Sequence, residues 1–318
     1  MPWRVGIDEA GYGPNFGPLV MTAVACRVPD ALVEENLWRA LKPAVRKHTC
    51  KTTKRLLVDD SKLVYSTARG IGDLETSVLS ILQGANETLP PTIAQLVDGL
   101  HGDHELGGEP WYAGKTVVPL TIEPATIAKA AGRFRETCDA AQVIWTMFRC
   151  VIVCPPRFNA WLDQWGTKGT ILSVGLVQLL NAVQALEPAE PINIVVDKHG
   201  GRNAYGAMLQ EAFADGWVTP IEEGMESSVY GVQNRDRLVR VKFCPRADSG
   251  HFEVALASMI SKYVREALMA EFNAFWKQHV PDLEPTAGYP GDSERFLVAI
   301  RPALARLQIA EELVWRKR

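Results

Sequence analysis

The sequence has no apolar run that approaches the 18 or more residues of a membrane-spanning helix, so we expect no membrane segment. Its 318 residues include only six cysteines, and no Cys-x-x-Cys pair is among them, which excludes a disulfide scaffold. The net charge of −3 gives no sign of a globally basic nucleic-acid-binding protein. No internal repeat or low-complexity tract is visible, so nothing points to a repeat architecture.

The remaining composition is ordinary for a globular enzyme. Hydrophobic residues make up 47% of the chain and charged residues 22%, and the length fits one large domain with insertions or two small ones. Residues 2–4 lead directly into an apolar run, which does not resemble a signal peptide. We therefore expect a cytoplasmic protein with reduced cysteines, and we expect it to act as a monomer.

Two adjacent acids follow a short apolar run in residues 4–20. Neighbouring residues of a strand point to opposite faces, so Asp8 and Glu9 can meet at one ligand only if the strand ends or bends there. Three glycines within the next eight residues permit such a bend. Paired carboxylates at a strand end suit a hard divalent cation such as magnesium. The alternative is a pair of surface acids before a Gly/Pro turn.

Two further acids occupy similar positions later in the chain. Residues 192–196 are typical of a buried strand, and Asp197 follows them directly. In α/β folds ligands bind outside the carboxyl ends of strands, although an acid there can equally cap the next helix. Asp248 precedes a long amphipathic pattern that predicts a helix over about 252–278. Capping of that helix is the alternative to metal binding for Asp248.

The rest of the chain is divided by its patterns into a core and less regular parts. Residues 67–123 contain two plausible helices among Pro- and Gly-rich stretches, so we expect an insertion or small subdomain outside the core. We expect a second insertion at about 203–235. The part from about 250 to 318 reads as a C-terminal helical region of the same single domain.

Several of these stretches resemble, in the same order, the motifs of the type 2 ribonuclease H family, which comprises ribonucleases HII and HIII. Gly6-Ile7-Asp8-Glu9-Ala10-Gly11-Tyr12-Gly13-Pro14 is similar to its opening signature. The other matching stretches are Asp60-Ser61-Lys62-Leu63, Val151-Ile152-Val153 with the helix expected beyond it, Val195-Val196-Asp197, Arg246-Ala247-Asp248-Ser249, the segment from Ala257 to Glu266, and Gly288-Tyr289-Pro290.

The resemblance implies a ribonuclease H-like α/β fold with a mixed central sheet flanked by helices. It also implies four catalytic, metal-binding carboxylates, namely Asp8, Glu9, Asp197 and Asp248. In-line cleavage of a phosphodiester requires charge relief at the attacking water and at the leaving 3′ oxygen, which a two-metal site supplies. Four carboxylates balance the charge of two such cations, and we expect Mg²⁺ or Mn²⁺.

The resemblance further assigns substrate contacts to seven residues. These are Gly11, Tyr12, Gly13, Ser61, Lys62, Lys262 and Tyr289. In ribonuclease HII the central residue of the Gly-x-Gly loop is arginine, and the loop reads the 2′-hydroxyl that separates RNA from DNA. Here that residue is Tyr12, so the bidentate phosphate contact of a guanidinium is lost, while Gly11 and Gly13 still permit backbone contacts.

The implied function is a metal-dependent endonuclease that hydrolyses the RNA strand of RNA–DNA hybrids and leaves 5′-phosphate ends. Its partner is then a nucleic acid, either a hybrid or DNA with embedded ribonucleotides. One alternative is a protein of the same fold that binds nucleic acid without cleaving it. Tyr12 and the insertions are the features that favour this alternative. A second is a phosphotransferase on a related fold, although a further phosphate-binding Gly/Thr loop is missing from the sequence.

Overall fold

The computed structural model describes residues 1–48, 54–86, 88–100, 106, 108–112, 115–235 and 237–317. Its centre is a seven-stranded sheet in the order β5-β2-β1-β6-β9-β8-β7. The strands are β1 (Trp3–Ala10), β2 (Leu19–Arg27), β5 (Ile144–Val153), β6 (Ile192–Asp197), β7 (Gly216–Glu223), β8 (Ser228–Asn234) and β9 (Arg237–Cys244). β1, β6 and β9 run parallel, and the other neighbours are antiparallel. The expected mixed sheet is confirmed.

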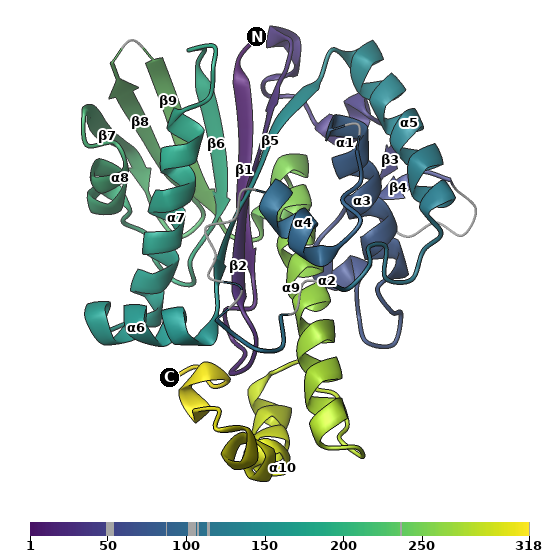
Figure 1. Ribbon diagram of the computed structural model, residues 1–318. Coiled ribbons are helices and arrows are strands. Elements are labelled where there is room, and N and C mark those ends of the chain that lie inside the picture. Colours follow the sequence, from purple (N-terminus) through teal and green to yellow (C-terminus); the bar gives the residue numbers. More distant parts are fainter. Residues whose placement is uncertain are drawn as a thin grey trace.

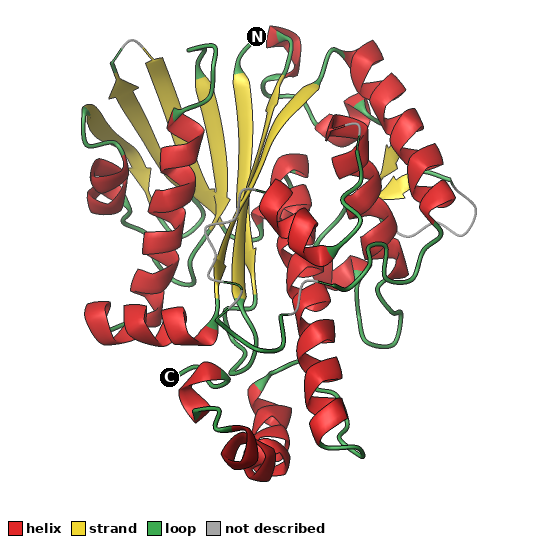
Figure 2. Ribbon diagram, in the orientation of Figure 1, coloured by secondary structure: helices red, strands yellow, loops and turns green. Residues whose placement is uncertain are grey.

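Helices cover both faces of this sheet (Figures 1 and 2). The principal ones are α3 (Gly72–Asn86), α5 (Pro124–Ala141), α6 (Pro155–Trp165), α7 (Lys168–Gln184), α8 (Gly206–Ala212), α9 (Phe252–His279) and α10 (Pro290–Leu307). The shorter elements include α1 (Leu37–Ala40), β3 (Val45–Arg46), β4 (Leu56–Leu57), α2 (Ser61–Val64) and α4 (Ile93–Gly99).

The alternation of β2 shows how the two cores form. Leu19, Met21 and Ala23 pack in the hydrophobic cluster that includes α7 and α8, whereas Val20 and Val24 pack in the cluster that includes α9. Both sets are fully buried because successive strand residues point to opposite faces and each face has a helix over it. A strand covered on both faces reads as a continuous apolar run, as residues 19–27 do.

β1 continues further than the sequence indicated. Asp8 and Glu9 were expected where the strand ends, but β1 remains paired with β2 as far as Ala10. The pairing of β1 with β6, however, ends at Ile7 and Val196. The two acids therefore lie on a strand that has lost one neighbour, which opens the sheet beside them without ending β1.

The region at 67–123 is more central than expected. Its two predicted helices are confirmed as α3 and α4. α3 buries Leu74, Val78 and Ile81 in the same cluster as α9, so the expectation that this region lies outside the core is wrong for α3. The buried Glu75 carboxylate accepts hydrogen bonds from the Tyr263 hydroxyl, at 2.8 Å, and from backbone N–H groups of 120–122. The Tyr263 bond ties α3 to α9, and the backbone bonds tie α3 to residues 120–122.

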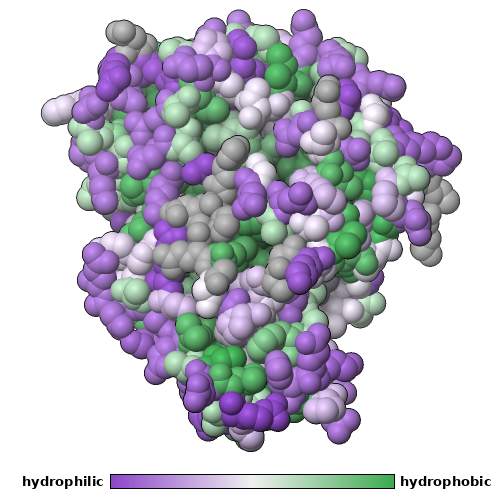
Figure 3. Space-filling model, in the orientation of Figure 1, coloured by the Kyte–Doolittle hydropathy of each residue, from purple (hydrophilic) through white to green (hydrophobic). Residues whose placement is uncertain are grey.

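The surface agrees with the composition. Polar side chains cover most of the face in Figure 3, with apolar ones gathered in smaller areas between them. None of the helices in the described part of the chain is long and apolar enough to cross a membrane.

Candidate active site

Three separate segments bring acidic side chains to one end of the sheet. Asp8 and Glu9 come from β1, and Asp197 is the last residue of β6. Asp248 lies in a 3-10 turn (Ala247–Ser249) between β9 and α9. The Ala247 N–H donates to Asp197 Oδ1 at 2.7 Å, which fixes the turn that carries Asp248 against the end of β6. β1 and β6 run parallel, so their carboxyl ends lie at the same end of the sheet.

Asp8 is the most deeply buried of the four carboxylates. One of its oxygens accepts a hydrogen bond from the Glu9 N–H at 2.8 Å, and the Ser258 side chain on α9 also hydrogen-bonds to it. Burial, and then the negative charges of Glu9 and Asp197, raise the pKa of Asp8 well above its ordinary value. Asp8 is thus held in a place where its charge is poorly compensated.

The other three carboxylates show the same electrostatic pattern. Burial first, then the charge of Asp197, raise the pKa of Glu9 to about 7. Burial also raises the pKa of Asp197. For Asp248, burial and the neighbouring charges of Asp60 and Asp197 raise the pKa to about 6. Four acids with raised pKa values form a region of negative potential that would favour a cation.

The donor chemistry of this set fits hard divalent cations, which take carboxylate oxygens as ligands. In the described residues, however, no group of three or more His, Cys, Asp or Glu side chains is close enough together to hold a metal ion. The four acids are therefore electrostatic neighbours rather than a compact coordination shell.

α2 contributes charge and support to these acids. Asp60 caps the helix by accepting a hydrogen bond from the Lys62 N–H at 2.8 Å, and its own charge reaches Asp248. The positive charge of Lys62 lowers the pKa of Glu9, Asp197 and Asp248, so Lys62 faces the acids. Ser61 is buried and its hydroxyl accepts from Ser258 at 3.0 Å, so this side chain links α2 to α9.

The other residues assigned to substrate include two exposed tyrosines. Tyr12 is 37% exposed and Tyr289 is 47% exposed, and the charge of Glu9 acts on the Tyr12 hydroxyl. Gly11, next to Tyr12, has φ +89°, a conformation that favours glycine. Lys262 forms an ion pair with Glu266 at 2.7 Å and lies over the Tyr65 ring. The role of these residues in substrate binding stays a prediction.

Two groups at this site were not singled out as functional by the sequence. Asp60 acts electrostatically on Asp197 and Asp248, and Ser258 hydrogen-bonds to Asp8. Both lie inside stretches that resemble family motifs, which is the one signal that could have identified them. Their partners are distant in sequence, so local patterns do not reveal the contacts.

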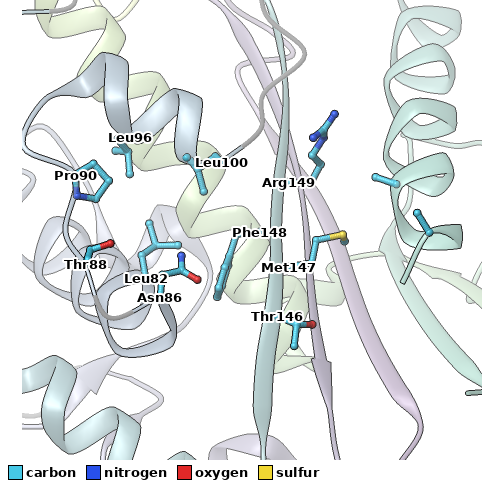
Figure 4. A pocket seen from close by; sticks show the side chains of 13 residues that line it. Leu82, Asn86, Thr88, Pro90, Leu96, Leu100, Thr146, Met147, Phe148 and Arg149 are labelled. Atoms are coloured by element: carbon cyan, nitrogen blue, oxygen red, sulfur yellow. The ribbon is translucent and has the colours of Figure 1, made fainter. Parts of the chain in front are cut away.

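A cavity of about 600 Å³ lies elsewhere, between α3, α4 and β5 (Figure 4). The residues described around it include Leu82, Leu96, Phe148 and Arg149, and no carboxylate is among them. This cavity is therefore separate from the acidic site.

Comparisons with known proteins agree with the motifs. No family model matches the chain. It is 31% identical over 145 residues to ribonuclease HII of Chlamydia abortus, covering 42% of this chain and 62% of the relative. It is 26% identical over 139 residues to ribonuclease HII of Gluconobacter oxydans, covering 41% and 66%. The chain thus spans less than two thirds of the length of either relative.

Among solved structures, it superposes with the PCNA:RNase HII complex of Archaeoglobus fulgidus at a TM-score of 0.45 and 19% identity, covering 99% of this chain and 94% of the other. For ribonuclease H2 of Pyrococcus horikoshii the TM-score is 0.43 at 15% identity, with 98% and 92% covered. By its ordered motifs and its two ribonuclease HII matches, the chain is similar to proteins of the type 2 ribonuclease H family.

Proposed function

We propose that this protein is a metal-dependent endonuclease that hydrolyses the RNA strand of RNA–DNA hybrids and leaves 5′-phosphate ends. The observation that carries the proposal is the convergence of Asp8, Glu9, Asp197 and Asp248 from three segments of the chain. Carboxylates with raised pKa values destabilise the fold when they are ionised. Their gathering at the carboxyl ends of parallel strands therefore favours a role in binding a ligand.

The balance of charge favours cation binding. Lys62 is a cation that acts on three of the four acids, and one ammonium does not neutralise four carboxylates. Asp8, Glu9, Asp197 and Asp248 are the residues that would hold Mg²⁺ or Mn²⁺. A pair of bound divalent cations supplies charge relief at the attacking water and the leaving 3′ oxygen.

The protein's own residues would orient the substrate around these acids. The loop of Gly11, Tyr12 and Gly13 presents backbone groups beside Glu9, and backbone groups can contact a ribose 2′-hydroxyl. Tyr12 and Tyr289 are exposed enough for their rings to pack against a sugar or base. Lys62, next to the acids, can offset the negative charge of a phosphate.

Cleavage assays with matched substrates test this function. We expect the purified protein to cleave a continuous RNA–DNA hybrid or a duplex with one embedded ribonucleotide, in Mg²⁺ or Mn²⁺, with 5′-phosphate products on end-label mapping. An all-DNA duplex of the same sequence should stay intact, as should every substrate in excess chelator. Binding of the hybrid without cleavage in either metal would instead identify a nucleic-acid-binding protein of this fold.

Divalent metal should also stabilise the fold, independently of any substrate. A ligand at about a hundred times its dissociation constant stabilises the native state by about 2.7 kcal/mol, which corresponds to a rise in Tm of roughly 5 °C. We expect such a rise with Mn²⁺ in thermal unfolding of the wild type. Asp8→Asn should show a much smaller rise. An equal rise in both proteins would place the metal somewhere other than these acids.

A further inference from the structure

Two arginines lie buried beneath the loop that carries Gly11 and Tyr12. Arg265 on α9 is 1% exposed and Arg316 is 0% exposed. Arg265 Nη1 is 3.6 Å from Glu266 Oε1, whereas no acid in the described part of the chain forms an ion pair with Arg316. Burial, and then the charge of Arg265, lower the pKa of Arg316 to about 9. A buried cation with so little compensation is costly, so its contacts call for an explanation.

The contacts of Arg316 are with the loop itself. Its Nη2 donates to the Gly11 carbonyl at 2.7 Å, and its backbone N–H donates to the Asn15 carbonyl at 2.8 Å. In return, the Asn15 side-chain amide donates to the Arg316 carbonyl at 3.3 Å. The guanidinium lies over the Phe158 ring, 4.8 Å from its centroid. Arg316 is therefore joined to the loop by three hydrogen bonds. One comes from its side chain, and two involve its backbone.

Arg265 joins the loop to a second segment. Its Nη2 donates to the carbonyls of Phe16 and Ala287, both at 3.0 Å. The Gly288 carbonyl accepts from the Asn15 N–H at 2.7 Å, so the two segments also contact each other directly. Tyr289 follows Gly288, and its ring centroid is 6.0 Å from the Arg265 guanidinium. One arginine thus supports both of the exposed places assigned to substrate.

The glycines show how closely the loop lies on Arg265. A Cβ added at Gly11 would lie 2.5 Å from Arg265 Nε, and Gly11 has φ +89°. Contacts this short cannot form without movement, so only glycine lets the loop reach the arginine. The loop and the arginines are therefore fitted to each other as one unit.

We propose that Arg265 and Arg316 are positioning residues that fix the Gly11–Gly17 loop against the Gly288–Tyr289 segment, and so set the spacing of the two surfaces that receive the nucleic acid. The inference rests on the proposed function, because it assumes that these two surfaces bind substrate. Neither arginine reaches the substrate, since both are buried. Their effect is on the conformation of the loop backbone.

Replacement of Arg316 tests the proposal. Arg316→Met keeps the aliphatic stem and removes the donors to Gly11, while Arg316→Lys keeps the charge and one potential donor. Hydrogen bonds to charged groups contribute about 1.5–3 kcal/mol, so we expect Arg316→Met to raise KM for the hybrid about tenfold or more and to change kcat by less than about threefold. Arg316→Lys should restore part of the loss.

The matched control is Lys317→Ala in the same segment, whose side chain pairs instead with Asp163. It should leave KM unchanged.

Hydrogen exchange of the amides of residues 11–17 gives a readout that needs no activity. We expect about tenfold faster exchange in Arg316→Met, confined to this loop and the segment at 286–289. Loss of kcat with unchanged KM and unchanged loop exchange would overturn the inference, as would a uniform rise of exchange over the whole domain. If the wild type cleaves no hybrid, the proposed function fails, and the exchange pattern still shows whether the arginines position the loop.

Discussion

Replacing Asp8 with Asn is expected to reduce hybrid cleavage by about a thousandfold, equivalent to about 4 kcal/mol of transition-state stabilisation. Asp8 is the most buried acid of the site and lies in electrostatic contact with both Glu9 and Asp197. Asn keeps the shape and one oxygen but removes the charge that would attract a cation. Single-turnover kinetics with saturating hybrid and Mn²⁺ measure the loss in the chemical step.

The fold of Asp8→Asn should remain intact. The pKa of Asp8 is raised in the native state, so its ionisation opposes folding, and its contribution to stability falls as the pH rises above the unfolded value. Removing the charge should therefore leave the metal-free protein at least as stable as the wild type near neutral pH. Asp282→Asn, the same change on an exposed turn after α9, is the control and should leave cleavage unaffected. Wild-type cleavage by Asp8→Asn would contradict the assigned site.

Part of the acidic site could be predicted because each acid stands next to a short, recognisable stretch of sequence. Residues 192–196 form a short apolar strand, and the acid directly after it had to lie at a strand end. The approach of Asp197 to the β1 acids was not predicted, because it depends on the parallel pairing of β1 with β6 in the sheet. The extent of β1 was not predictable in the same way. It depends on β2 continuing to pair after β6 has ended, which is a property of the sheet.

The parts that sequence patterns did not reveal depend on contacts between distant segments. β7 was missed because it is an edge strand with most of its residues exposed and with Pro220 and two acids among them, so it lacks the apolar alternation of a half-buried strand. The burial of Arg265 and Arg316 was also hidden, because arginine in a helix or near a basic tail normally indicates an exposed side chain. Their partners lie some 250 and 300 residues away.

Gly6 is the residue that allows α9 to approach the acids. It lies on the face of β1 that carries Asp8, and its Cα faces the backbone of α9 at Glu253 and Val254. This close approach lets Ser261 Oγ donate to the Asp8 carbonyl at 3.2 Å and brings Ser258 within reach of the Asp8 side chain. It also places the buried Glu253 beside Arg4 at 2.8 Å. A larger residue at position 6 would disturb all three contacts.

Gly6→Ala is therefore expected to destabilise the fold by at least about 3 kcal/mol in the free energy of unfolding, measured with denaturant. The new Cβ would lie 2.2 Å from the Glu253 carbonyl carbon and 2.4 Å from the Val254 nitrogen, and helix backbone cannot move aside as a flexible side chain can. Gly132→Ala is the matched control, because a Cβ at this position in α5 meets open space and should stabilise the helix by about 0.5–1 kcal/mol. Equal effects of the two substitutions would show that α9 does not rest on Gly6. If Gly6→Ala still folds, its cleavage activity should fall together with its stability, since the displaced helix carries the two serines that hold Asp8 in place.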